Sequence, residues 1–432
     1  MVARPSLLDW EVMLSKDNEY RGFVVVALLA IVFTGVQLVY NGSLTPHEHS
    51  WTIWRSLASP TGMWVADATL VGSMFVAIGL VKLLVSDCIS RATFRLLHFV
   101  WISTWVGTAL WWSWVAQWDW LPTIFFVLHT FCMLCKHYAY LAGNSELYDY
   151  SIELRQLKRD LAVIASHASE HHDDDAAIVH SIEARVEELE SVLYASKVVF
   201  PQNVTVANFV DYLLIPRLVY NLDYPRTDGI RWDYLLGKVA GFAMSFAFLY
   251  MDIEFCIMPV LNRLTTLSFT GAVINLIMPM MVAYMMVFVI IFEFILNAFA
   301  EVTCYADRAF YEDWWNCVNF AEFARKWNRP VHEFLLRHVY LSALRTGRIS
   351  KSTAAFITFF LSSVAHEVVM IWASKRWSLW LFAMQMSQLP LIWAANLPFM
   401  RGHIILGNAF FWFGLAVGPP LLMIAYLRDH FL

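Results

Sequence analysis

The run FITFFLSSVAHEVVMIWA, residues 356–373, decides how the rest of the sequence is interpreted. As a helix it is long enough to cross the hydrocarbon of a bilayer, which takes about 20 mainly apolar residues. The whole chain has the same character, because 59% of its 432 residues are hydrophobic and only 15% are charged. So few charges cannot cover a water-facing surface of this size. This composition excludes a disordered chain, a nucleic-acid binder and a soluble enzyme with an ordinary surface.

Apolar runs of similar length recur along the chain and predict an all-α polytopic membrane protein. About nine transmembrane helices are expected, at residues 22–40, 62–85, 96–115, 120–140, 233–251, 270–299, 353–373, 379–399 and 404–427. Each run is close to the length of one span. The sixth run is longer, so we expect it to tilt or to extend beyond the bilayer.

Lysine and arginine residues predict the orientation of these spans. If the N-terminus is cytosolic, the cytosolic segments hold 22 of the 30 basic residues and the opposite side holds 5. Cytosolic loops of membrane proteins carry an excess of Lys and Arg. The asymmetry therefore predicts a cytosolic N-terminus and, with nine spans, a lumenal C-terminus.

The spans divide the chain into four parts, which are a short cytosolic segment at 1–21, four spans at 22–140, a cytosolic helical loop at 141–232 and a core at 233–432. In the loop, apolar residues at helical spacing predict a helix at 178–193. It would either bind a partner or, as we favour, pack on its own protein. In the core, 301–351 is dense in aromatic residues interleaved with charges, which predicts amphipathic helices in the membrane interface. Pro330 should break the segment, with a new helix starting near Val331.

His366 and Glu367 are adjacent ionisable residues inside the seventh span. Ionisable residues within a span are costly, and they usually face a cavity and have a function. Three interpretations follow from the residues alone. His366 would be a general base in an intramembrane reaction, a proton relay in a transporter, or a packing histidine. Ser362 lies four residues earlier, on the same helical face.

Four ordered motifs around this pair resemble the membrane-bound O-acyltransferase superfamily, and more narrowly its fungal sterol O-acyltransferase branch. They are YPRTDGIRW at 224–232, FYEDWWN at 310–316, KWNRPVHEFLLRHVY at 326–340 and SSVAHE at 362–367. Diacylglycerol O-acyltransferases have similar motifs, typically with Glu where this chain has Asp313. The resemblance is strong over about 214–427 and weaker over the first 140 residues.

The resemblance implies an MBOAT-like fold, in which helices enclose an intramembrane reaction chamber. It also implies transfer of a fatty acyl group from acyl-CoA to the 3-hydroxyl of a sterol, giving a steryl ester for lipid storage. His366 would be the general base, and Asn328 would position the acyl-CoA and donate a hydrogen bond to its thioester. Glu367 would orient His366 or bond to a neighbouring helix. The alternatives are a diacylglycerol O-acyltransferase and, in another class, a proton-coupled lipid transporter.

The same resemblance implies where the substrates bind. The residues expected to contact acyl-CoA are Trp314, Trp327, His332, Tyr340, Lys351 and Ser362. The motif residues are Phe310, Tyr311, Asp313, Trp314, Trp315 and Asn316. Acyl-CoA is a substrate, so we expect no cofactor and no metal site. The other expected partners are sterol, membrane lipids and further copies of the chain, as a homodimer or a dimer of dimers. No nucleic acid is expected, and the expected location is the endoplasmic reticulum membrane.

Overall fold

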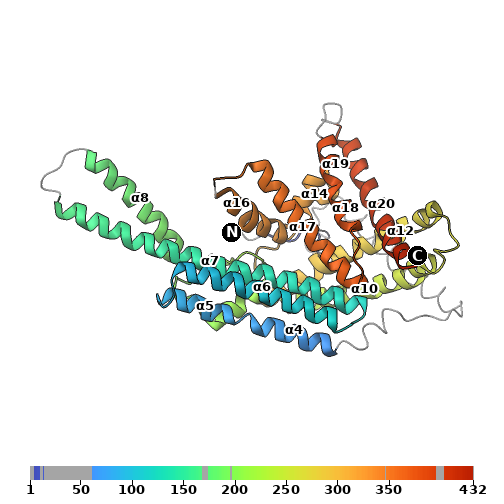
Figure 1. Ribbon diagram of the computed structural model, residues 1–432, viewed down its shortest axis with the longest axis horizontal. Helices are drawn as coiled ribbons and strands as arrows, with labels where there is room; N and C mark the ends of the chain where they lie inside the picture. The colour runs from blue at the N-terminus through green and yellow to red at the C-terminus, as the bar shows by residue number, and fades with distance from the viewer. Residues whose placement is uncertain are drawn as a thin grey trace. The chain divides into compact units, whose positions relative to one another are not determined.

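A computed structural model describes the chain at residues 4–9, 13, 61–167, 174–194, 197–345, 347–395 and 403–431. These residues form helices and two isolated bridges, with no strand among them. The helices (Figure 1) are α4 (Thr61–Ser73), α5 (Val76–Val85), α6 (Arg91–Val115), α7 (Trp120–His167), α8 (Asp174–Tyr194), α9 (Val206–Leu214), α10 (Trp232–Asp252), η1 (Ile253–Ile257), α11 (Met258–Leu261), α12 (Phe269–Phe288), η2 (Val289–Ile295), α13 (Leu296–Val302), η3 (Trp314–Asn316), α14 (Phe320–Lys326), α15 (Arg329–Phe334), η4 (Leu335–Tyr340), α16 (Leu341–Arg345), α17 (Lys351–Ser374), α18 (Trp380–Met386), α19 (Gln388–Ala395) and α20 (Ile404–Phe431).

Among the described residues, six helical stretches are long and apolar enough to cross a membrane. They are Thr61–Val85, Trp120–Ile164, Trp232–Leu261, Phe269–Val302, Lys351–Ser374 and Ile404–Leu427. The all-α membrane class is confirmed, but the count of nine is not. The span expected at 22–40 lies outside the described residues. The span expected at 96–115 lies in the continuous helix α6, whose many Trp, Ser and Thr residues lower its mean hydropathy. The span expected at 379–399 is divided at Ser387 into α18 and α19.

The chain forms two compact units. Unit 1 comprises Met1–Val65, Trp112–His129 and Pro225–Leu432, and unit 2 comprises Ala66–Trp111 and Thr130–Tyr224. In unit 2, α8 runs beside the C-terminal part of α7 (Figure 1), and Arg185 of α8 pairs with Glu153 of α7 at 2.8 Å. Leu189 of α8 is almost fully buried. The helix predicted at 178–193 therefore exists and packs on its own chain.

A buried lysine in α7 anchors the end of α9 within unit 2. The ammonium of Lys136 donates to the main-chain carbonyls of Tyr212, Ile215 and Arg217, at 2.9, 2.7 and 2.9 Å. The last carbonyls of a helix lack partners inside the helix, and a cation is favourable at that negative end. These contacts explain why a lysine is accommodated within an apolar run.

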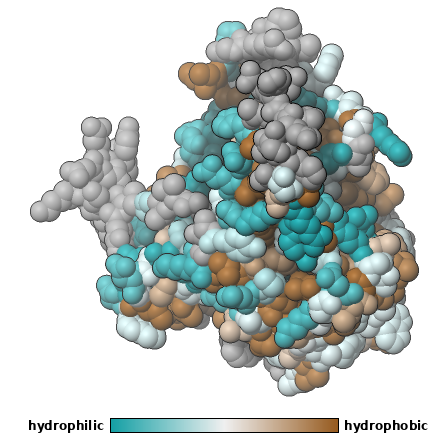
Figure 2. Space-filling model, turned by 90° about the vertical axis from the view of Figure 1, so that its left-hand side faces the viewer, coloured by the Kyte–Doolittle hydropathy of each residue, from teal (hydrophilic) through white to brown (hydrophobic). Residues whose placement is uncertain are grey.

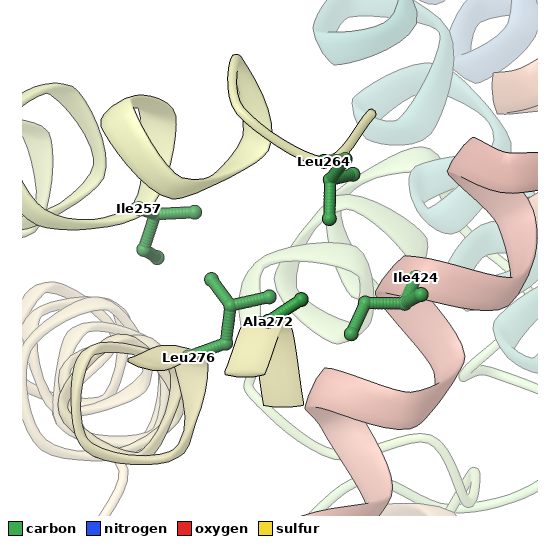
Figure 3. Close-up of a cluster of buried hydrophobic side chains, with 5 residues drawn as sticks. All are labelled: Ile257, Leu264, Ala272, Leu276 and Ile424. Atoms are coloured by element: carbon green, nitrogen blue, oxygen red, sulfur yellow. The ribbon is translucent and has the colours of Figure 1, made fainter. Parts of the chain in front are cut away.

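In unit 1, the long helices pack through small residues and aliphatic side chains. Ile257, Leu264, Ala272, Leu276 and Ile424 form a buried cluster between η1, α12 and α20 (Figure 3). Elsewhere, a Cβ atom added to Gly241 of α10 would lie 2.3 Å from the ring of Phe294 in η2, so α10 and η2 approach closely only because this residue is glycine.

Large hydrophobic side chains are also open to the surface. Trp64, Phe99, Trp111 and Met278 are each more than half exposed. On the face in Figure 2, hydrophobic side chains, shown in brown, lie beside hydrophilic ones in teal. Apolar surface of this extent is expected where lipid tails rather than water surround the protein.

Candidate active site

Helix α17 carries His366 and Glu367, and hydrogen bonds fix both of its ends within unit 1. Ser350 caps its N-terminus by accepting a hydrogen bond from the Thr353 amide at 3.1 Å. The helix ends at Ser374, and Lys375 then adopts the left-handed conformation with φ of 54°. The ammonium of Lys375 donates to the carbonyl of Ser113 at 2.9 Å, which ties this end of α17 to the end of α6.

His366 presents its free ring nitrogen to the surroundings. Its Nδ1 lies 2.7 Å from the carbonyl oxygen of Ser362, one turn earlier in α17. A carbonyl oxygen can only accept a hydrogen bond, so Nδ1 carries the proton and donates it. In the neutral ring, Nε2 then holds the lone pair. The side chain is exposed, so Nε2 is accessible and is able to accept a proton.

Glu367 points to other helices. It is 3% exposed, and its Oε1 accepts from the hydroxyl of Tyr426 in α20 at 2.8 Å. Its Oε2 accepts from the amide of Phe382, in the first turn of α18, at 2.6 Å. Neither bond involves His366, so the geometry favours the second of the two expected roles, a bond to neighbouring helices. A carboxylate at a helix N-terminus also interacts favourably with the helix dipole.

The aromatic motif residues form one packed cluster with α12, η2, α14 and α20. The ring centroids of Trp314 and Trp327 are 4.8 Å apart, and Phe288 lies 5.2 Å from Trp314 and 4.8 Å from Trp327. Tyr311 packs against Phe288 at 4.9 Å, and Trp315 against Trp314 at 5.8 Å. Edge-to-face contacts at these distances add to the energy of burial. Trp314 is buried, and its indole N–H has no hydrogen-bond partner among the described residues.

Two of the sequence motifs bind each other directly. The amide of Arg329 donates to the carbonyl of Phe310 at 3.0 Å. Lys326 pairs with Asp313 at 2.9 Å, and the side-chain amide of Asn316 donates to the same carboxylate at 3.3 Å. The FYEDWWN and KWNRP segments thus form one unit, in which Asp313 has a structural partner.

The Asp313–Lys326 pair predicts a pH-dependent contribution to stability. The bond from Lys326 lowers the pKa of Asp313 below its ordinary value of 3.8. A carboxyl group with a lowered pKa stabilises the fold above its unfolded value, and this contribution is lost as the pH falls through the folded value. The unfolding temperature of Asp313→Asn should therefore lie below that of the wild type at pH 7, and the difference should shrink as the pH falls below 3.8 and through the lowered pKa of the folded state. The measurement is thermal melting in detergent. A difference in unfolding temperature that is the same at pH 7 and below pH 3.8 would contradict this role.

Asn328 begins helix α15. Its Oδ1 accepts from the amide of Val331 at 3.2 Å, and its Nδ2 has no partner among the described residues. Its amide N–H₂ group is therefore able to donate a further hydrogen bond. The interruption predicted at Pro330 is confirmed, because α15 starts at Arg329 with Pro330 in its first turn. No hydrogen bond joins Asn328 to His366 among the described residues.

His332 lies in an open groove of about 420 Å³, most of whose lining residues are charged. The groove is lined by Glu312, Glu322, Arg325, Lys326, Arg329, His332, Glu333 and Leu336. Burial lowers the pKa of His332 below its ordinary 6.5, so its ring is neutral at pH 7. Lys326 pairs with Glu322 at 2.7 Å and Arg329 with Glu333 at 3.1 Å. Arg325 is the lining cation without an ion pair among the described residues.

The remaining predicted residues lie along or next to α17. Tyr340 ends η4, which packs against α17, and Lys351 is the first residue of α17. Sequence reasoning missed Asn408 and Trp412 of α20. Their side-chain N–H groups donate to the carbonyl of Trp315, at 2.9 and 3.0 Å. The available signal was their spacing of four residues, which places both on one helical face.

Comparison with known proteins agrees with this arrangement. Residues 109–428 match the family model described as MBOAT, membrane-bound O-acyltransferase family. The chain belongs to the membrane-bound O-acyltransferase family. The match covers the aromatic motifs, α17 with His366, and the α20 residues that hold Trp315, so this arrangement lies within the family region.

Similar relatives within the family carry two kinds of name. The chain is 36% identical to Sterol O-acyltransferase 2 of Saccharomyces uvarum over 333 residues, which are 72% of this chain and 50% of that protein. It is 29% identical to Probable sterol O-acyltransferase 1 of Schizosaccharomyces pombe over 447 residues, covering 95% of this chain and 82% of the relative. It is 33% identical to Diacylglycerol O-acyltransferase 1 of Dictyostelium discoideum over 241 residues, covering 54% of this chain and 39% of the relative. The chain spans about half the length of the Saccharomyces relative that it matches.

Proposed function

We propose that the chain transfers a fatty acyl group from acyl-CoA to the 3-hydroxyl of a sterol, giving a steryl ester. The observation that carries the proposal is His366, whose Nδ1 donates to the Ser362 carbonyl so that Nε2 is free to accept a proton. Membership of an acyltransferase family favours this base over the proton relay of a transporter. The names of the fungal relatives support sterol as the acceptor.

The proposed reaction needs one base and one hydrogen-bond donor. Nε2 of His366 accepts the sterol hydroxyl proton as that oxygen attacks the carbonyl carbon of the thioester. The N–H₂ group of Asn328 donates to the oxyanion of the tetrahedral intermediate. The intermediate then collapses, its carbon–sulfur bond breaks, and the CoA thiolate takes the proton from His366. All transferred groups come from the two substrates, so these steps call for no cofactor.

The charged groove around His332 supports entry of acyl-CoA at residues 312–336, which line it. Arg325 has no ion pair among the described residues and would attract a phosphate. His332, being neutral, would contribute a hydrogen bond rather than a charge. The partly exposed ring of Trp327, which packs on the buried Trp314, provides apolar surface nearby, which suits the part of the substrate close to the acyl chain.

The second candidate acceptor is diacylglycerol, which the Dictyostelium relative favours. That relative covers 54% of this chain, against 95% for the Schizosaccharomyces sterol relative. Wider coverage supports sterol, and so does Asp313, a position at which diacylglycerol enzymes typically have Glu.

We further propose that the protein lies in the endoplasmic reticulum membrane with its N-terminus in the cytosol and its C-terminus in the lumen. The excess of basic residues on one side supports this orientation. A homodimer or a dimer of dimers in contact with membrane lipids is the proposed assembly.

One assay tests both the enzyme class and the acceptor. The purified protein, supplied with radiolabelled oleoyl-CoA and equal amounts of sterol and diacylglycerol, should form labelled steryl ester. Labelled triacylglycerol alone would replace sterol by diacylglycerol as the acceptor. If neither ester formed, the acyltransferase proposal would be contradicted. The alternative of a proton-coupled lipid transporter would then be favoured.

A further inference from the structure

The N-terminal residues Arg4–Asp9 belong to unit 1 and bind residues of its C-terminal part, which are far away in the sequence. The amide of Arg4 donates to the carbonyl of Ala306 at 3.3 Å, and the amide of Arg308 donates to the carbonyl of Arg4 at 2.8 Å. The guanidinium of Arg4 donates two hydrogen bonds to the carboxylate of Asp307, at 3.0 and 2.9 Å. A two-point contact of this kind fixes orientation as well as distance.

Two residues further on, the segment reaches the hydroxyl of a motif residue. Ser6 is 1% exposed, and its hydroxyl donates to Oε2 of Glu293 at 2.7 Å and lies 3.2 Å from the hydroxyl oxygen of Tyr311. The amide of Leu8 donates to the same Tyr311 oxygen at 3.1 Å. Tyr311 in turn donates to Oε2 of Glu293 at 3.1 Å. Two contacts from the segment therefore hold the Tyr311 hydroxyl in place.

Asp9 completes a buried charged network. It accepts from the hydroxyl of Tyr234 at 2.8 Å, and the ammonium of Lys238 lies 3.4 Å from Asp9 and 3.5 Å from Glu293. Lys238 is 1% exposed, so two carboxylates share one ammonium away from water. Removing a partner from a buried charge is strongly destabilising. The network is therefore a specific binding site for Arg4–Asp9 and not an incidental surface contact.

The residues that bind Arg4–Asp9 include Tyr311, which also belongs to the aromatic cluster. The ring of Tyr311 packs on Phe288 at 4.9 Å, and Phe288 contacts both Trp314 and Trp327, at 5.2 and 4.8 Å. Tyr311 is also three residues before Trp314 in the same motif. A shift of the Tyr311 hydroxyl would therefore be transmitted through a close-packed group of rings.

We propose that Arg4–Asp9 is a positioning element for acyl-CoA binding: through Ser6 and Leu8 it holds Tyr311, and through Tyr311 it holds the Trp314–Trp327 pair against which acyl-CoA packs. The inference rests on the proposed function for the identity of the acyl donor. Among the described residues, no hydrogen bond or ion pair joins Arg4–Asp9 to His366 or Asn328, so loss of the segment should weaken acyl-CoA binding without slowing the chemical step.

The test compares acyl-CoA binding with turnover in the full chain. Ser6→Ala should raise the dissociation constant for oleoyl-CoA, measured without any acceptor, by about tenfold, which is about 1.4 kcal/mol of binding free energy. The KM for oleoyl-CoA should rise in parallel, and kcat at saturating oleoyl-CoA should be unchanged. Ser6→Thr keeps the hydroxyl and should restore most of the binding.

Arg4→Gln provides a second variant at a half-exposed position and should show the same weakened binding. Its matched control is Arg185→Gln, which breaks an ion pair between α7 and α8 in unit 2 and should bind oleoyl-CoA normally. Normal binding by both Ser6→Ala and Arg4→Gln, or equal weakening in Arg185→Gln, would overturn the proposal. A wild-type protein that binds oleoyl-CoA yet esterifies no sterol would contradict the proposed function alone.

Discussion

His366→Ala should lower the rate of steryl ester formation by about a thousandfold, because general base catalysis contributes roughly 10²–10⁴ to a rate. The unfolding temperature should stay unchanged, since the described contact of the imidazole is a bond to its own helix, at Ser362. The measurement is esterification of sterol by labelled oleoyl-CoA, with thermal melting of the same preparation.

The matched control for this variant is His180→Ala. His180 is an exposed histidine on α8 in unit 2, so its loss removes an imidazole without touching α17. It should retain wild-type activity. If purified His366→Ala kept most of its activity, His366 would not be the base, and a packing role would explain it better.

Asn328→Asp should lower kcat by about 10²-fold or more, the usual cost of losing one oxyanion donor. The substitution separates two functions of this residue. An Asp side chain can still accept the Val331 amide and cap α15. It cannot donate to the thioester oxygen, and its charge would repel the developing oxyanion. Stability should therefore persist while activity is lost.

The same substitution at another helix start is the control. Asn319 caps α14 by accepting from the Glu322 amide at 2.9 Å. Asn319→Asp keeps that acceptor and should leave both stability and turnover near those of the wild type. Activity of Asn328→Asp equal to that of Asn319→Asp would show that Asn328 serves only as a helix cap.

Local patterns in the sequence predicted the class of fold and several helix boundaries. Apolar length predicted α17 and α20 because a span of about 20 residues leaves a continuous local signal. Pro330 predicted the start of α15, because proline suits the first turn of a helix and disrupts its interior. The helix at 178–193 was predicted from apolar residues that recur at helical spacing. The division of 379–399 at Ser387 was not predicted, because a uniformly apolar run carries no mark of where it bends.

Candidate site residues could be named from the motifs, but their contacts could not. Adjacent positions 366 and 367 suggested a working pair, and the structure shows Glu367 bound to Phe382 and Tyr426 instead. Successive residues of a helix point about 100° apart, so neighbours in sequence face different partners. Asp313 looked like a mark of substrate class, and its visible contact is the ion pair with Lys326.

By itself, the sequence determined that this protein is a helical membrane protein with a histidine and a glutamate side by side in one apolar run. Hydrophobicity, charge asymmetry and motif order are properties of the chain that need no coordinates. Only the tertiary structure decided that Glu367 binds Phe382 and Tyr426, that Asn408 and Trp412 hold Trp315, and that Ser6 meets Glu293. The Ser6–Glu293 contact spans 287 residues. Pairings at such separations depend on how whole helices pack, and no local pattern records them.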